Sequence, residues 1–302
     1  MAQRYKSLIF SAIFSTILLN DAHAYRCKET SCSDIRVGLG AFHSNFKFNY
    51  DNGSKAEYNN TGGYLSIYAG KYWKWAAFDT NINLGIGSSN VFNNNLLVKN
   101  YGGFIGVDFS IGTNLGSLKT PILLLLTVGS DGYDLAWRNR EHKLGISMPF
   151  IGTSVAGLKT INKNIDIEYS LRYGYIFGGA YEIHAMSNKS FLNGGHRIEA
   201  SIGMLLRQDM SNLSQFEIDR KLDFYIQLKG IYRNVNASDI IIVNSKAINY
   251  PANNSFAILF EFGIASHLNS RFESYDTSTH DMLPPLKAPN IDNKPPLTNI
   301  IY

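Results

Sequence analysis

The sequence predicts an all-β fold, a closed antiparallel up-and-down transmembrane β-barrel of about ten strands. Three observations support this class: runs in which apolar and polar residues alternate, connections that alternate between long and short, and an N-terminal export segment. The clearest run is residues 164–177 (NIDIEYSLRYGYIF). Its odd-numbered residues from Ile165 to Phe177 are all apolar or aromatic, and its even-numbered residues include Asp166, Glu168 and Arg172. A period of two predicts a strand, and this polarity is typical of lipid on one face and a polar lumen on the other.

The chain begins with a predicted secretory signal peptide, residues 1–24. Arg4 and Lys6 form its positive region, SLIFSAIFSTILL its apolar region, and Ala22-His23-Ala24 a small-x-small cleavage pattern. The alternative is a membrane anchor, but the apolar run is shorter than the roughly 20 residues of a spanning helix. We therefore expect export, cleavage after Ala24, and a mature chain that starts at Tyr25.

The composition of the remaining chain favours strands. No later apolar stretch approaches the length of a spanning helix. Aromatic residues make up 13% of the chain and charged residues 17%, and the formal charge of +4 is dispersed. The absence of a basic stripe argues against a nucleic-acid partner. A soluble β-sandwich shares this composition and remains the competing fold.

Both cysteines, Cys27 and Cys32, lie in a periplasmic lead-in predicted at residues 25–32. In an exported protein this spacing predicts a small disulfide loop, because the compartment is oxidising. No further ligands nearby indicate a metal site.

Ten strand candidates follow in the predicted barrel, residues 33–266. They are residues 34–50, 64–71, 76–86, 101–111, 121–129, 143–156, 164–177, 197–206, 221–233 and 255–266. The first changes phase from Ile35, Val37 and Leu39 to Phe46, Phe48 and Tyr50, which predicts a bulge or a rim position. The sixth presents Leu144, Ile146, Met148 and Phe150 as its apolar face, and Pro149 weakens it.

The predicted connections alternate in length. Long polar loops are expected at 51–63, 88–100, 130–142, 178–195 and 235–254, with shorter turns between them. Long loops outside the cell and short periplasmic turns are typical of outer-membrane barrels, and an even strand number returns both ends to the periplasm.

On this pattern the chain resembles the small up-and-down outer-membrane β-barrel proteins of Gram-negative bacteria. The resemblance covers about residues 33–266 and implies assembly by the barrel assembly machinery in a membrane of lipid and lipopolysaccharide. Such barrels often end at an aromatic residue of the last strand, whereas a tail of residues 267–302 follows here. Its five prolines, Pro284, Pro285, Pro289, Pro295 and Pro296, predict an extended, disordered periplasmic segment.

The inward face is expected to carry charges of both signs. They are Arg36, Asp79, Asp108, Asp166, Glu168, Arg172, Arg197, Glu199, Asp223, Lys229, Arg233 and Glu261. Buried charges must pair to offset their desolvation, and small barrels leave little open space. We therefore expect a plugged lumen, with a narrow porin-like channel for small solutes as the alternative.

Two groups of aromatic residues are predicted to form membrane-interface girdles: Tyr72, Trp73 and Trp75 at a periplasmic turn, and Tyr175, Phe177 and Tyr181 near the outer rim.

Catalytic motifs of membrane barrels are missing from the sequence. Outer-membrane phospholipases and lipid A deacylases use His-x-Ser, and none of the seven histidines has Ser two positions later. The surface proteases called omptins use Asp-x-Asp and Asp-x-His, and the one Asp-x-His, Asp21 to His23, lies in the signal peptide. A site assembled from His142, Asp131 and Asp134 stays open. The expectation is a non-enzymatic scaffold in the outer membrane, without cofactors, whose surface loops contact host or environmental ligands.

Overall fold

A computed structural model describes residues 31–49, 55–93, 96–135, 144–162, 164–183, 188–191, 193–207, 223–243, 246–249 and 251–265. None of these residues forms a helix long and apolar enough to cross a bilayer. The predicted signal peptide, the tail 267–302 and Cys27 lie outside the described residues. The first strand begins at Ser31, so the last two residues of the predicted lead-in belong to it, and the last strand ends at Ala265.

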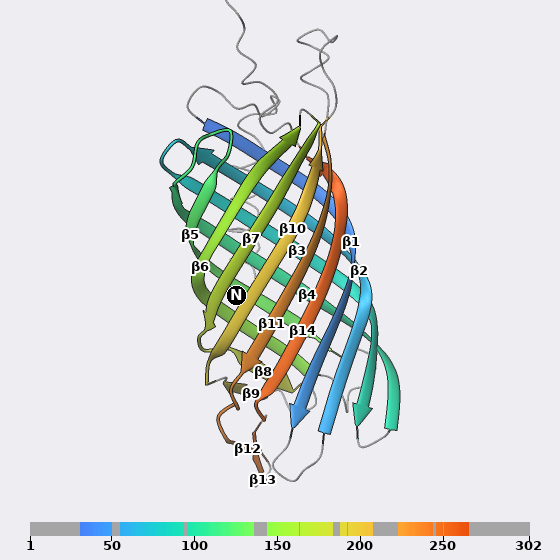
Figure 1. The fold of residues 1–302 in the computed structure, drawn as a ribbon. Coiled ribbons are helices and arrows are strands. Elements are labelled where there is room, and N and C mark those ends of the chain that lie inside the picture. The colour runs from blue at the N-terminus through green and yellow to red at the C-terminus, as the bar shows by residue number, and fades with distance from the viewer. Residues whose placement is uncertain are drawn as a thin grey trace, which may run out of the picture. The chain divides into compact units, whose positions relative to one another are not determined.

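Ten strands of the described chain form a closed antiparallel barrel, as the sequence predicts (Figure 1). Each pairs with its neighbours along the chain, and β1 pairs with β14 to close the sheet. They are β1 (Ser31–Asn49), β2 (Lys55–Trp73), β3 (Ala77–Asn93), β4 (Leu96–Asn114), β5 (Ile122–Asp134), β6 (Leu144–Asn162), β7 (Ile165–Ile176), β10 (Gly195–Leu206), β11 (Asp223–Val235) and β14 (Asn253–Ala265).

The strands tilt strongly against the barrel axis (Figure 1). Following paired residues around the sheet from Ile146 of β6, through Gly40 of β1 and Glu261 of β14, leads back to β6 at Leu158, twelve residues further along. Such a stagger is the geometric partner of strand tilt in a closed barrel. We call the end that holds Ser31 and Ala265 the turn end, and the opposite end the loop end.

Two predicted loops are wrong, because most of their residues lie in strands. Residues 55–63 belong to β2, and residues 88–93 and 96–100 belong to β3 and β4, which are separated by two residues. Many outward side chains there are polar, such as Thr61 and Ser88, so the apolar outer face that marks a membrane strand is interrupted, although Phe92 and Leu97 also face outward. Backbone pairing nevertheless continues without a register shift, since ladder hydrogen bonds do not require an apolar face.

The predicted loop 178–195 contains the hairpin of β8 (Ala180–Ile183) and β9 (Asn188–Phe191). On β6, Phe150 pairs with Ile176 of β7 and Ser147 pairs with Ala180 of β8. One extra residue therefore lies between β7 and β8, at a break where Gly178 has a φ of 55°. β8 thus continues the line of β7 beyond a bulge.

Pro149 lies in the interior of β6 and explains where this bulge falls. Its carbonyl accepts a hydrogen bond from the Phe177 N–H at 3.0 Å. The nitrogen of a strand residue faces the same neighbour as its carbonyl, so the missing N–H of Pro149 faces the break. On its other side β6 pairs with β5, where Pro149 is opposite Ser130, and the break removes no hydrogen bond from that ladder.

Another small sheet, β12 (Ile241–Val243) with β13 (Lys246–Ile248), lies in the predicted loop 235–254. Figure 1 shows it, like β8 and β9, at the loop end.

The predicted bulge in β1 is wrong, and so is the predicted outward face of β6. β1 pairs with both neighbours without a register shift, and Phe46 and Phe48 point inward and are buried. Leu144, Ile146 and Met148 of β6 are also buried. Both errors have the same cause. Near the loop end the barrel interior is apolar, so the inward residues there have the apolar character that was expected of lipid-facing residues.

Candidate functional site: the barrel lumen

The outer wall of the barrel carries a continuous apolar belt. Large apolar side chains that are 40% exposed or more occur on nine of the ten barrel strands, and they include Leu39, Leu84, Phe109, Leu126, Ile151, Leu171, Ile202, Leu228 and Phe260. β2 is the exception, and Leu65 and Ile67 on its outer face are partly exposed. A soluble sheet would cover such a surface, whereas hydrocarbon solvates it.

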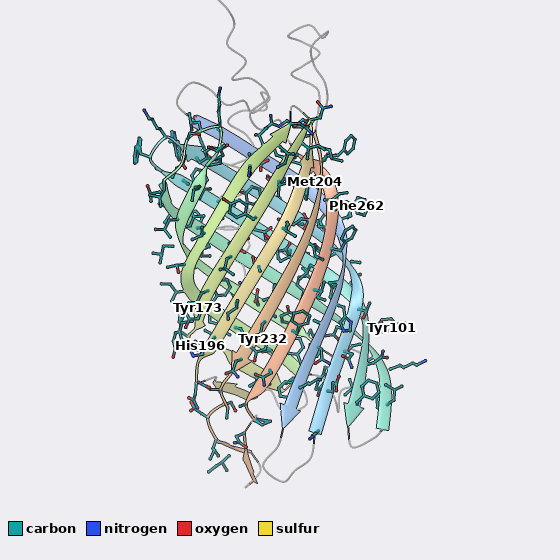
Figure 2. All side chains as sticks on the ribbon, in the orientation of Figure 1. Tyr101, Tyr173, His196, Met204, Tyr232 and Phe262 are labelled. Carbon is teal, nitrogen blue, oxygen red and sulfur yellow. The ribbon has the colours of Figure 1, made fainter. Side chains whose placement is uncertain are left out.

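Aromatic rings gather on the outside at the loop end of this belt. Figure 2 shows Tyr173, His196 and Tyr232 there on neighbouring strands. The Tyr173 ring stacks on the His196 imidazole with centroids 5.9 Å apart, and the Tyr175 ring meets the same imidazole edge-on at 5.9 Å. Amphipathic rings at this level are typical of a membrane interface.

The predicted girdles are partly wrong. Tyr175 and Phe177 face outward, and Trp75 is 76% exposed, whereas Trp73 is partly exposed and contacts Lys71. Tyr72 and Tyr181 point into the barrel and are buried. Both occupy inward positions of the alternating pattern, Tyr72 on β2 and Tyr181 on β8, which continues β7. The direction of each side chain is therefore set by this alternation and not by its distance from the rim.

The structure places the twelve predicted lumen charges on the inner face. Arg36, Asp79, Asp108, Asp166, Arg197, Glu199, Asp223, Lys229, Arg233 and Glu261 are buried, and Glu168 and Arg172 are partly buried. Eight of them form ion pairs with other charged groups of the barrel interior.

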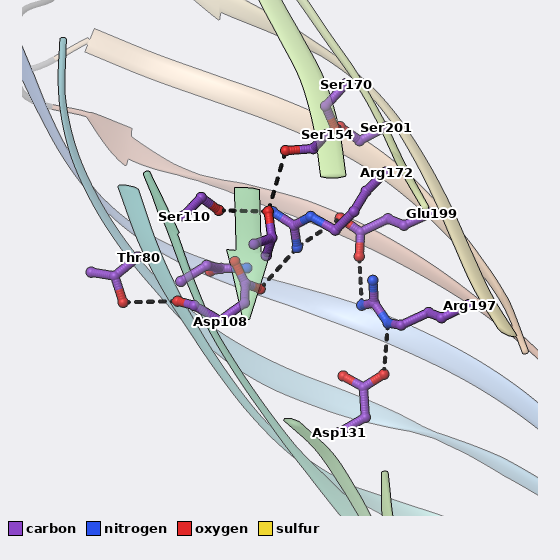
Figure 3. Close-up of polar contacts among 12 residues, drawn as sticks. Thr80, Asp108, Ser110, Asp131, Ser154, Ser170, Arg172, Arg197, Glu199 and Ser201 are labelled. Atoms are coloured by element: carbon purple, nitrogen blue, oxygen red, sulfur yellow. Dashed lines mark hydrogen bonds and ion pairs between the residues drawn. The ribbon is translucent and has the colours of Figure 1, made fainter. Parts of the chain in front are cut away.

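One chain of ion pairs crosses the lumen (Figure 3). Arg172 of β7 lies with Nη1 3.2 Å from Asp108 Oδ2 of β4 and 3.7 Å from Glu199 Oε1 of β10. Glu199 Oε2 accepts a hydrogen bond from Arg197 Nη2 at 2.7 Å, and Arg197 Nε donates to Asp131 Oδ2 of β5 at 2.9 Å.

Arg233 of β11 ends this chain. Its Nε and Nη2 donate to the same Asp131 oxygen at 2.8 and 2.6 Å. Three acids and three arginines alternate along the chain from Asp108 to Arg233, so their formal charges cancel. The chain joins strands on opposite walls and therefore braces the barrel internally.

A second cluster lies nearer the turn end, around Arg36 of β1. Its Nε donates to Asp34 Oδ2 at 2.6 Å, and its Nη1 donates to Glu168 Oε2 of β7 at 2.5 Å while Nη2 pairs with Oε1. The guanidinium carbon lies 5.3 and 5.4 Å from the ring centroids of Tyr68 and Tyr225. This is a bidentate pair enclosed by aromatic faces.

Glu261 and Asp166 make further contacts in the lumen. Glu261 accepts hydrogen bonds from Tyr64 Oη at 2.9 Å and from Tyr225 Oη, which links β14 to β2 and β11. Asp166 forms an ion pair with Arg207 at the turn end.

Beyond these charges, towards the loop end, the lumen is filled by an apolar core. Its buried members come from seven barrel strands, from β8 and from the residue that follows β5, and they are Phe46, Phe48, Ala56, Tyr58, Val91, Tyr133, Leu135, Leu144, Ile146, Met148, Phe150, Ile176, Tyr181 and Val235. Phe46 meets Tyr133 edge-on with centroids 4.8 Å apart, and Phe48 meets Tyr58 at 5.7 Å. The Arg197 guanidinium lies 4.4 Å above the Phe150 ring, so the charge chain and the core are in direct contact.

Aromatic rings also lie directly against inward glycines in the middle of the barrel. A Cβ at Gly40 would lie 2.3 Å from the Tyr64 ring, and one at Gly85 would lie 2.2 Å from the Phe104 ring. Each glycine is the register partner of the residue that covers it. The ring thus replaces the missing side chain and protects that stretch of backbone.

A cavity of about 160 Å³ remains in the turn-end half of the lumen. Its lining includes Asp34, Arg36, Asp79, Asp108 and Lys229. The apolar core separates it from the loop end.

Several of these groups were missed by sequence reasoning. Asp131 was assigned to a loop, because the strand prediction stopped at residue 129. The alternation in fact continues inward through Thr127, Gly129, Asp131 and Tyr133, and following it would have found Asp131. The hydrogen-bonding tyrosines Tyr64 and Tyr225 gave no signal, since an inward tyrosine is not distinctive in sequence.

The two described residues of the catalytic alternative, Asp131 and Asp134, do not lie on the same face of β5. Asp131 faces the lumen and is tied to two arginines, while Asp134 lies on the opposite face of β5, and His142 lies outside the described residues. Within the described part of the chain, no group of three or more His, Cys, Asp or Glu side chains could hold a metal ion. Cys32 is disulfide-bonded, and the chain's other cysteine is Cys27.

The closed ten-stranded barrel with its apolar belt defines a class, the small up-and-down outer-membrane β-barrel proteins. No family model and no curated protein matches the chain. Among solved structures, the outer membrane protease OmpT from Escherichia coli is similar, with 8% identity, a TM-score of 0.45, and coverage of 79% of this chain and 96% of that one.

OprG from Pseudomonas aeruginosa is also similar, with 10% identity, a TM-score of 0.36 and coverage of 79% and 95%. Ail, the attachment invasion locus protein of Yersinia pestis, has 10% identity, a TM-score of 0.26 and coverage of 77% and 98%. At these identities and scores the similarities carry no assignment of activity or ligand, and the function below is argued from the lumen and the surface.

Proposed function

We propose that this protein is a non-conducting, non-enzymatic scaffold of the outer membrane, whose barrel holds surface hairpins for interaction with external ligands. The observation that carries the proposal is the apolar core in the loop-end half of the lumen. Hydrated ions cannot cross a region filled by Phe46, Met148 and Tyr181, because the packed side chains leave no room for their water and offer few polar groups to replace it. The charge chain beneath it is paired internally and braces the wall.

The loop end faces the outside of the cell in this proposal. Four connections at that end carry ordered hairpins or long strand extensions, as extracellular loops of such barrels do. Export and cleavage after Ala24 deliver Ser31 to the periplasmic side, where the barrel assembly machinery acts. The intact mass of the purified protein tests this step: a mature chain that begins at Tyr25 supports it, and retention of residues 1–24 contradicts it.

A surface role is supported by the β12–β13 hairpin. Ile240 and Ile242 are 68% and 79% exposed there, outside the apolar belt. Exposed apolar residues on a hairpin that needs no lipid contact favour an interaction surface. Replacing residues 236–252 by a short turn should leave the barrel folded and abolish binding of cells to a target that the wild-type protein recognises.

Planar-bilayer recording tests the closed lumen. The purified, refolded protein should show no stable open level, while a known porin inserted in parallel shows that the bilayers report open channels. Heat-modifiable migration on a gel confirms that the inserted protein is folded. A stable, ohmic open level of the folded wild-type protein would overturn the proposal.

The alternative is a narrow channel for small solutes, and the observation in its favour is the charged 160 Å³ cavity in the turn-end half. A channel would need the loop-end core to move aside. The triple substitution Phe46→Ala, Phe48→Ala and Met148→Ala separates the two functions: the scaffold predicts openings in this variant alone, and the channel predicts them in both proteins.

A further inference from the structure

A groove lies on the outer wall of the barrel. Its volume is about 1030 Å³, at the upper end of the roughly 300–1,000 Å³ of ligand pockets. Its lining includes Leu39, Leu84, Ile86 and Ile105, whose side chains are between 44% and 66% exposed and belong to the outward face. Most of its lining residues face outward, which distinguishes it from the lumen, and the inward-facing residues Tyr64, Phe104, Tyr133 and Ile146 of the same strands line it as well.

Outward glycines form the floor of this groove. They are Gly63 on β2, Gly103 on β4, Gly132 on β5 and Gly145 on β6. Three of them lie in one row of paired residues across the sheet: Gly63 pairs with Ile86, Ile86 with Gly103, Gly103 with Asp134, and Asp134 with Gly145. Glycine has no side chain, and here one lies on every second strand, next to leucines and isoleucines. This arrangement leaves a trough in a wall that is otherwise convex.

The inner side of the same wall is rigid. Gly40 and Gly85 also line the groove, and the rings of Tyr64 and Phe104 cover them from the lumen. The trough is thus a fixed feature of the sheet, one backbone thick and supported from behind by aromatic rings.

The groove is continuous with the lipid-facing belt, so its surroundings are lipid chains and other membrane proteins. It rises from Leu39 towards Ser147 of β6 and Ala180 of β8 at the loop end. A second barrel would present a convex wall, which cannot enter a trough between side-chain ridges. A flexible hydrocarbon chain can enter it, and burial there removes apolar surface on both partners.

We propose that this groove is a specific binding site for one acyl chain of a lipid in the leaflet at the loop end. The polar lining residues, Asp134 and Ser147, lie at the end where the lipid's polar part begins, so they favour a head region that presents hydroxyl or amine donors. The inference depends on the membrane location of the barrel and on the loop end being outside, but not on whether the lumen conducts.

Two outward glycines provide a matched test. At Gly63 the nearest atom to an added Cβ is the Gly40 carbonyl oxygen at 3.6 Å, and at Gly230 on β11 nothing lies within 4 Å. Both positions therefore accept a side chain without a clash. Gly63→Leu fills the groove, while Gly230→Leu adds the same side chain to the belt on the opposite wall.

The experiment uses each full-length protein in phosphatidylcholine vesicles that contain a fraction of lipid with a photoactivatable diazirine on its acyl chain. After illumination, labelled peptides are quantified by mass spectrometry. Peptides containing Leu65, Leu84 and Ile105 should carry severalfold more label than those containing Ile202 and Leu228. Gly63→Leu should reduce this ratio to about one, and Gly230→Leu should leave it unchanged.

Equal labelling of both walls in the wild-type protein overturns the proposal, as does an excess that survives Gly63→Leu. Chemical cross-linking of the same samples examines a second copy as occupant: a dimer that Gly63→Leu abolishes would assign the groove to self-association instead. Heat-modifiable migration shows that each variant is folded, so loss of label cannot arise from loss of the barrel.

Discussion

Removing the negative charge of Asp131 should strongly destabilise the barrel, and removing its partner as well should restore part of the loss. Asp131, Arg197 and Arg233 have side chains that are 9%, 3% and 1% exposed, so none is effectively solvated. Asp131→Asn keeps the shape and removes the charge that both guanidinium groups contact. Breaking a buried ion pair by removing one partner costs about 3–5 kcal/mol.

The remaining contacts show which arginine has no charged partner in the Asp131→Asn variant. Arg197 keeps its bond to Glu199 at 2.7 Å, whereas Arg233 keeps the neutral Tyr133 hydroxyl, which accepts a bond from its Nη2 at 3.0 Å. The stranded charge is therefore Arg233. The double variant Asp131→Asn/Arg233→Met replaces it with an apolar side chain next to the apolar core, and we expect it to recover about 1–3 kcal/mol relative to the single variant.

Urea unfolding in lipid vesicles, followed by tryptophan fluorescence and by gel migration, measures these differences. Asp239→Asn, at an exposed position of the loop end, is the control and should change the free energy of unfolding by less than about 0.5 kcal/mol. If the double variant is less stable than Asp131→Asn by the full cost of a second independent substitution, the stranded-charge reasoning is refuted.

Two further predictions concern packing. Gly85→Ala should lower the free energy of unfolding by about 1–3 kcal/mol, since its Cβ overlaps the Phe104 ring, whereas Gly230→Ala, measured by the same urea titration, should have little effect; equal effects would contradict the ring contact. Met148→Ala should cost about 2–5 kcal/mol because it opens a cavity in the apolar core, while Phe256→Ala on the lipid-facing wall should cost clearly less, and a reversed order would show that the loop-end interior is not packed.

The sequence predicted the barrel, its strand number and the inward parity of its charges, because these depend on local alternation. Residues 164–177 form β7 in the predicted phase, with Leu171 and Tyr173 outward and Asp166 inward. The same rule failed for β6, where Leu144 and Met148 point inward. Alternation gives the period of a strand, but the identity of each face depends on what fills the interior at that height.

The pairing of the lumen charges could not be predicted for a related reason. Arg172 and Asp108 are on strands that are not adjacent in the sheet, and their contact depends on the tilt and stagger of the closed barrel. Sequence spacing contains neither quantity. The limits of β2, β3 and β4 were missed because their polar outer faces beyond the belt look like loops.

Closure through β1 and β14 affects how each molecule folds. One of the two ladders of β1 is formed with Asn253–Ala265, the last barrel strand along the chain. Until this ladder forms, two strand edges, rich in apolar side chains, are open to pairing with any other chain. Contacts of such long sequence separation form slowly. A chain that has not yet closed this seam is therefore prone to aggregation, and the finished barrel, which has no open edge between β1 and β14, is protected.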